Sequence, residues 1–225
     1  MNNRLKHYLK RIELLAQTTN AKFPAELQEL INKFKHTLAK GSFKEKSLLL
    51  DQHTKLPEFA DYLALEFDKQ YINEDLLIET WYLNEILPHL SKDLYDEVTN
   101  IIRDLKEAYR ADDLEKKFNI YADVGENLSE KFLTYFYGED EPMPLLNAQL
   151  KYYLEYLQYL LKECQVGGEF EKPLKDFVSK VEAALTSTEK AEKENVVEMF
   201  DDITTKFGRY LDEHFVDFKM YKFGE

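Results

Sequence analysis

The sequence predicts an all-α protein, a multi-helix bundle of about eight to ten helices with few or no strands. Three observations predict this class. The 225 residues include 7 glycines and 6 prolines, far fewer than a fold of short strands and tight turns needs. Apolar side chains recur every three or four residues along nearly the whole chain, as in amphipathic helices. No stretch combines strict alternation with the β-branched residues that favour strands.

Prolines, glycines and capping residues predict where several helices begin and end. Pro24 suits the first turn of a helix that ends at Gly41, and Pro57 suits the first turn of another. Asn73, followed by two acidic residues, predicts the N-cap of a separate helix that ends at Pro88. No segment recurs at a fixed period.

Composition indicates one folded domain over residues 1–225. The chain is 44% hydrophobic and 32% charged, which is typical of a protein that buries a core. The loop GEDEPMP, residues 138–144, is a possible point of subdivision into 1–137 and 145–225. No run reaches the roughly 18 apolar residues of a membrane span. A single cysteine, Cys164, cannot form an internal disulfide. We therefore expect a cytoplasmic protein.

The stretch KYYLEYLQYLL, residues 151–161, contains four tyrosines. On a helix, Tyr153 falls on a seam of leucines and is expected in the core, with Tyr156 beside that seam. Tyr152 and Tyr159 lie further round the helix, where a ring can pack while its hydroxyl stays hydrated. Such a position suits either a domain edge or a protein interface. The candidate partner-binding residues are therefore Tyr152 and Tyr159, together with Glu139, Asp140 and Glu141 of the acidic loop.

Charge is distributed unevenly along the chain, which has a net charge of −13. Residues 1–46 hold ten Lys or Arg and four Glu, whereas residues 47–225 hold 20 basic and 39 acidic groups. The basic segment either packs against the acidic helices or binds nucleic acid or an acidic partner. The acidic remainder would attract a basic protein, because complementary charge accelerates encounter.

These charges lead to two hypotheses. The preferred one is a non-enzymatic acidic binding protein that recognises another, possibly basic, protein as an inhibitor, immunity or antitoxin-type factor. Another is a structural or scaffolding bundle that binds through its basic N-terminal segment. Nucleic acid is not an expected partner except through residues 1–46.

Motifs of metal and cofactor chemistry are missing from the sequence. It contains no glycine-rich phosphate loop, no cysteine pair, no His-Glu-x-x-His and no Glu-x-x-His. These patterns supply the ligands of nucleotide, zinc and di-metal sites. We expect no cofactor and no metal.

One short motif favours an enzymatic alternative. Residues 209–214, Arg-Tyr-Leu-Asp-Glu-His, resemble the Arg-x4–6-His signature of the HEPN ribonucleases. The resemblance implies an all-α, metal-independent ribonuclease in which Arg209 holds the scissile phosphate and His214 shuttles the proton. It covers six residues, and Asp212, Glu213 and Asp217 beside it would repel an RNA backbone. The non-enzymatic hypothesis is therefore preferred.

Overall fold

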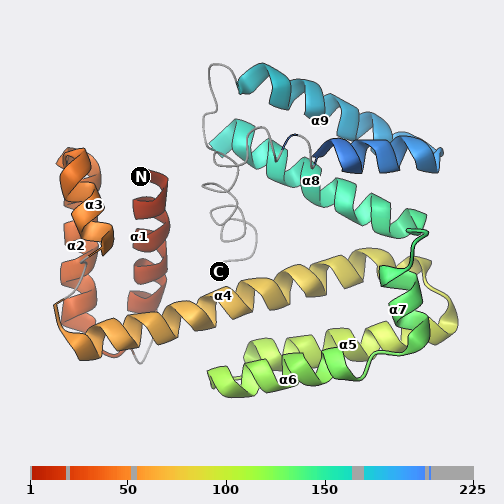
Figure 1. Ribbon diagram of the computed structural model, residues 1–225. Helices are drawn as coiled ribbons and strands as arrows, with labels where there is room; N and C mark the ends of the chain where they lie inside the picture. Colours follow the sequence, from red (N-terminus) through yellow and green to blue (C-terminus); the bar gives the residue numbers. More distant parts are fainter. Residues whose placement is uncertain (1, 19–20, 52–54, 164–169, 201–202, 204–225) are drawn as a thin grey trace. The chain divides into compact units, whose positions relative to one another are not determined.

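The computed structural model describes residues 2–18, 21–51, 55–163, 170–200 and 203, and within these ranges every regular element is a helix (Figure 1). The prediction of an all-α fold is confirmed. No helix in the described ranges is long and apolar enough to cross a membrane. The elements are α1 (Asn2–Gln17), α2 (Pro24–Lys40), α3 (Phe43–Asp51), α4 (Pro57–Ile86), the 3-10 helix η1 (Leu87–His89), α5 (Lys92–Arg110), α6 (Leu114–Glu126), α7 (Glu130–Tyr137), α8 (Met143–Glu163) and α9 (Glu171–Thr186), followed by helical residues 190–200.

The corner between α2 and α3 follows the sequence signals closely. Pro24 occupies the first turn of α2, and the N–H of Gly41 donates to the carbonyl of Thr37 at its end. A Cβ atom on Gly41 would lie 2.6 Å from that carbonyl oxygen, so the close approach requires glycine. Ser42 and Glu45 then form a capping box, with N–H to carboxylate and N–H to hydroxyl distances of 2.7 and 3.3 Å. These hydrogen bonds lower the pKa of Glu45, mainly through the Ser42 N–H.

The prediction that Asn73 begins a separate helix is wrong, because α4 continues through it. Ile72 and Leu76 are both buried, so the helix is held in the core on either side of this position. The adjacent Glu74 binds Arg11 of α1 through its carboxylate. Tertiary contacts therefore override the local capping signal of the Asn-Glu-Asp sequence.

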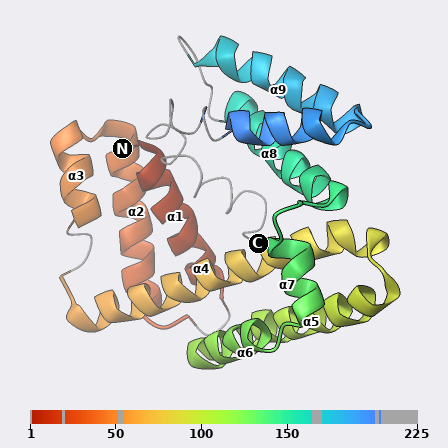
Figure 2. The ribbon, with the colours of Figure 1, turned by 45° about the vertical axis from the view of Figure 1, so that its right-hand side comes forward.

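Contacts divide the chain into two units, one of which contains the described residues up to Glu74 and the other those from Asp75. The division falls inside α4, and the loop after α7 belongs to the second unit. The single-domain prediction, with a possible subdivision at residues 138–144, stays a prediction. In the first unit, α1 and α2 run side by side in both views (Figures 1 and 2). They share a core of leucine, isoleucine and phenylalanine with α3 and the beginning of α4.

In the second unit, α8 packs on α9 and on residues 190–200 around one hydrophobic core. Tyr156, expected beside the leucine seam of α8, is fully buried, whereas Tyr153 is half-buried at the margin of this core. The Tyr153 ring stacks on Phe200 with a centroid distance of 3.7 Å. The tyrosine-rich helix thus uses these two rings to fill space between helices.

At two places in this unit, a buried lysine donates hydrogen bonds to carbonyl groups at the end of a helix. Lys117 Nζ donates to the carbonyl oxygens nine and eight residues before it, at 3.0 and 2.6 Å. Lys193 Nζ does the same at 2.5 and 3.3 Å. The negative end of a helix stabilises a cation there. Four buried residues of α5 precede Lys117 by the same numbers of positions as four buried residues of α9 precede Lys193. These residues are Val98, Ile101, Leu105 and Ala108 in α5, and Leu174, Phe177, Val181 and Ala184 in α9. One local arrangement therefore occurs twice, although no sequence repeat is evident.

Candidate functional site

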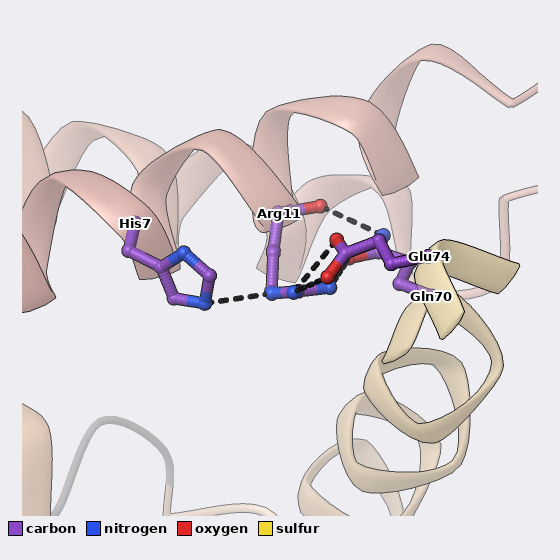
Figure 3. Close-up of polar contacts among 4 residues, drawn as sticks. All are labelled: His7, Arg11, Gln70 and Glu74. Atoms are coloured by element: carbon purple, nitrogen blue, oxygen red, sulfur yellow. Dashed lines mark hydrogen bonds and ion pairs between the residues drawn. The ribbon is translucent and has the colours of Figure 1, made fainter. Parts of the chain in front are cut away.

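The first unit contains a buried polar network centred on Arg11 (Figure 3). Arg11 Nη2 donates to both carboxylate oxygens of Glu74, at 2.8 and 2.9 Å. Its Nη1 donates to Gln70 Oε1 at 3.1 Å, and its Nε donates to His7 Nε2 at 2.9 Å. The guanidinium carbon also lies 3.8 Å from the centroid of the Tyr71 ring. Arg11 thus combines an ion pair, two further hydrogen bonds and a cation–π contact.

The features of this network are those of a buried ion pair that stabilises the fold, and not those of a reaction centre. The Arg11 side chain is 0% exposed and Glu74 is 3% exposed, so neither charge faces solvent. His7 accepts a hydrogen bond at Nε2, which requires the neutral imidazole. The guanidinium is engaged on three of its nitrogens by groups of α1 and α4. The basic charge of Arg11 is therefore satisfied inside the unit, as is that of Lys35, which pairs with Glu13 at 2.7 Å.

The acidic loop residues predicted to contact a partner differ in their surroundings. Glu139 is exposed, whereas Asp140 forms an ion pair with Lys190. Glu141 is half-buried and accepts a hydrogen bond from Gln149 Nε2 at 2.6 Å. Burial raises the pKa of the Glu141 carboxyl, and a neighbouring glutamate adds to that rise. The structure does not bring the three side chains into one common set of contacts, and their role in binding stays a prediction.

The two predicted partner-binding tyrosines are both half-buried and both pack against the core of the second unit. Tyr152 lies beside Trp81 of α4, with ring centroids 5.8 Å apart. Burial raises the pKa of Tyr152, and the negative charge of Asp75 raises it further. Contact of Tyr152 or Tyr159 with a partner stays a prediction. Arg209 and His214, the residues of the ribonuclease alternative, lie outside the described residues.

A group of residues, of which the sequence analysis predicted Tyr152 alone, lies around the C-terminal half of α4. The Tyr121 hydroxyl of α6 donates to Glu79 Oε1 at 2.5 Å. Burial raises the pKa of Tyr121, and the hydrogen bond to Glu79, the charges of Glu79 and Asp75, and the phenol of Tyr137 raise it further. Asp75 also raises the pKa of Tyr152, and it lies one helical turn before Glu79 on α4. We call Asp75, Glu79, Tyr121, Tyr137 and Tyr152 the tyrosine–carboxylate surface.

Four helices contribute to this surface, and α7 crosses beside the end of α4 in both views (Figures 1 and 2). Tyr137 is 75% exposed, a high value for a large aromatic side chain. Phe118 and Leu133, which are 49% and 45% exposed, lie one helical turn before Tyr121 and Tyr137, respectively. Exposed aromatic side chains are enriched at protein interfaces. From helical spacing, the sequence could predict that each of these residues shares a helix face with the tyrosine that follows it. It could not predict that the two helices contribute to one surface.

Negative charge predominates in the segment that carries Tyr121 and Tyr137. Residues 118–141 contain six acidic groups and a single lysine, Lys131. Lys131 is itself paired with Asp93 at 2.6 Å. Within the part of the chain that the structure describes, Glu79 has no ion-pair partner and is bonded by the neutral Tyr121 hydroxyl. The carboxylate charge on this side of the unit is therefore incompletely neutralised by the described residues.

The described residues contain no group of three or more His, Cys, Asp or Glu side chains that could hold a metal ion. Comparison with protein-family models, curated proteins and solved structures gave no match. The functional argument therefore depends on the geometry and charge of this chain.

Proposed function

We propose that this protein is a non-enzymatic, acidic helical binding protein that recognises another protein carrying a basic surface. The observation that supports the proposal best is the charge of residues 118–141. This segment has six carboxylates, of which Asp140 pairs with Lys190, and one ammonium group, which pairs with Asp93 outside the segment. A basic partner would supply the positive charge that the segment lacks.

The charge of the whole second unit supports the same proposal. Residues 75–219 contain 32 acidic and 17 basic groups. A surface of one predominant sign accelerates association with a partner of opposite sign and disfavours partners of like sign. An inhibitor, immunity or antitoxin-type factor that blocks a basic protein would benefit from both effects.

Charge reversal on the acidic side of the second unit tests the proposal. The test variant has Asp123→Lys, Glu126→Lys and Glu139→Lys, which are exposed residues of α6 and of the loop after α7. Immobilised wild type and variant are exposed to lysate of the native host at low and high salt, and bound protein is quantified. We expect a discrete basic protein that binds the wild type, is released by salt and fails to bind the variant.

A matched control separates a specific surface from net charge. The control variant has Asp176→Lys, Glu182→Lys and Glu198→Lys, which are exposed residues of α9 and of the helix after it. Both variants change the net charge equally, and circular dichroism verifies their folding. Retention of the partner by the control and its loss from the test variant support the proposal. Equal retention by all three proteins, or the absence of any salt-sensitive protein partner, contradicts it.

A further inference from the structure

We propose that the tyrosine–carboxylate surface is the docking point for an arginine side chain of the partner, an inference that rests on the proposed function. Glu79 is the centre of this site. Its Oε1 accepts a hydrogen bond from the Tyr121 hydroxyl, and its Oε2 accepts no hydrogen bond from the described residues. A carboxylate has room for several donors, so an incoming guanidinium can bind Glu79 without displacing Tyr121.

The aromatic side chains favour arginine over lysine as the incoming cation. The Tyr137 ring is 75% exposed, and α7, which carries it, lies beside α4 in both views (Figures 1 and 2). A guanidinium can stack its flat face on a tyrosine ring while its edge binds a carboxylate. An ammonium group can make either contact but has no planar face to stack. Phe118 and Leu133 beside these residues would then cover the apolar part of the arginine stem.

The first unit already contains an arginine bound in this way. Arg11 is bonded to Glu74 through Nη2 and lies 3.8 Å above the Tyr71 ring. Glu79 with Tyr137 offers the same two kinds of group at the surface of the second unit. The difference is that the described residues place no arginine there. The internal site thus shows which side chain the external groups are suited to bind.

The single tryptophan of the chain provides a direct readout. Trp81 lies 5.8 Å from Tyr152, which belongs to the surface. The probe is an acetylated, amidated peptide of six arginines, and the neutral control is the corresponding citrulline peptide. Both are titrated into full-length protein at low and high salt while Trp81 fluorescence is followed. We expect saturable binding of the arginine peptide that weakens with salt, and no binding of the citrulline peptide.

Four variants locate the binding. Glu79→Gln keeps the shape of the side chain and an acceptor for the Tyr121 hydroxyl, and Tyr137→Ala removes the exposed ring. Each is expected to weaken peptide binding about tenfold, as at interface residues that dominate affinity. Their matched controls are Glu182→Gln on α9 and Tyr95→Ala on α5, both exposed. The controls are expected to bind like the wild type. Equal affinity of all five proteins, or no binding to the wild type, overturns the inference.

Two further results distinguish this inference from the proposed function. If Glu79→Gln and Tyr137→Ala still capture the host protein that the triple charge reversal loses, the inference is overturned while the proposed function stands. If sedimentation shows that the wild type self-associates and that Glu79→Gln prevents it, the occupant is a second copy, and the proposed partner is wrong. Loss of the host protein from both single variants, with retention by both controls, supports the inference.

Discussion

Glu74 and Glu79 lie little more than one turn apart on α4, yet their surroundings differ. Glu74 is 3% exposed and receives two hydrogen bonds from the Arg11 guanidinium. Glu79 is exposed, and the described residues offer it a hydroxyl. The first carboxylate has its cation inside the protein, whereas the second has a polar neighbour that carries no charge. The comparison separates a carboxylate that holds the fold together from one that is available to another molecule.

The reason for the difference is the cost of burying charge. A carboxylate removed from water needs a cation and full hydrogen bonding, or the fold loses several kcal/mol. A carboxylate that keeps contact with water has no such need, because water solvates it. An exposed carboxylate without a cation is therefore tolerated at little cost to stability, and a partner that removes it from water must supply the cation.

The largest effect is expected from breaking the internal pair. Arg11→Met should lower the free energy of unfolding by about 3–5 kcal/mol, because Glu74 is left buried without its cation. Urea denaturation followed by circular dichroism measures the loss. The double variant Arg11→Met, Glu74→Leu should regain most of the stability, since no buried charge remains. A loss of unfolding free energy below about 1 kcal/mol in the single variant would show that the pair does not stabilise the fold. An equal loss in the single and double variants would show the same.

The buried lysines sharpen the comparison, because they are cations that donate hydrogen bonds to carbonyl groups at the end of a helix. Lys193→Met should cost about 1–3 kcal/mol, since carbonyl groups at the end of α9 lose their donor. Lys117→Met should cost a similar amount at the end of α5. Burial lowers the pKa of Lys193, which raises the cost of keeping it charged and partly offsets the loss. Unchanged denaturation midpoints in both variants would argue that these hydrogen bonds contribute nothing net.

The exposed carboxylate should be almost neutral for folding. Glu79→Gln is expected to change the free energy of unfolding by less than about 1 kcal/mol, because the amide oxygen can still accept the Tyr121 hydroxyl. The same denaturation experiment, run beside Glu74→Gln, compares the two positions on one helix. A loss at Glu79 as large as that at Glu74 would mean that Glu79 is structural, and the distinction between the two carboxylates would fail.

The smallest effect is expected in alkaline solution. The pKa of Tyr121 is raised by burial and by Glu79, so the folded protein keeps this proton to higher pH than the unfolded chain does. The stability that this supplies is complete below the unfolded tyrosine pKa of about 10 and is lost as the pH rises further. Glu79→Gln should move one tyrosine to ionise at lower pH, as measured by phenolate absorbance. Superimposable titrations of wild type and variant would contradict the proximity of the two side chains.

Much of the fold could be predicted from the sequence because its signals are local. As predicted, α2 begins at Pro24 and ends before Gly41. The missing N–H of proline and the missing Cβ of glycine affect only residues close in the sequence, so these signals are local. Asn73 misled the prediction because Ile72 and Leu76 are buried and Glu74 binds Arg11, which comes from a distant part of the chain. The order of burial within residues 151–161 depended on which neighbouring helix each tyrosine meets, which helical period alone does not specify.

The candidate site could be predicted much less well. Tyr152 was selected from its position on the helix, and it belongs to the tyrosine–carboxylate surface. Glu79, Tyr121 and Tyr137 come from three other helices, and nothing in the spacing of the sequence indicates that these helices meet. Glu79 differs from many other acidic residues because it accepts a hydrogen bond from a tyrosine and, within the described residues, has no cation beside it.

The measurement that tests the central claim most directly is the coupling between Glu79 and a single arginine of a ligand. Wild type and Glu79→Gln are each titrated with the six-arginine peptide and with peptides in which one arginine is replaced by citrulline. For at least one position, the account predicts that the replacement weakens binding to the wild type by about 1 kcal/mol more than it weakens binding to Glu79→Gln. Identical losses in both proteins at every position would mean that Glu79 does not contact the cation, and the account of this surface would be wrong.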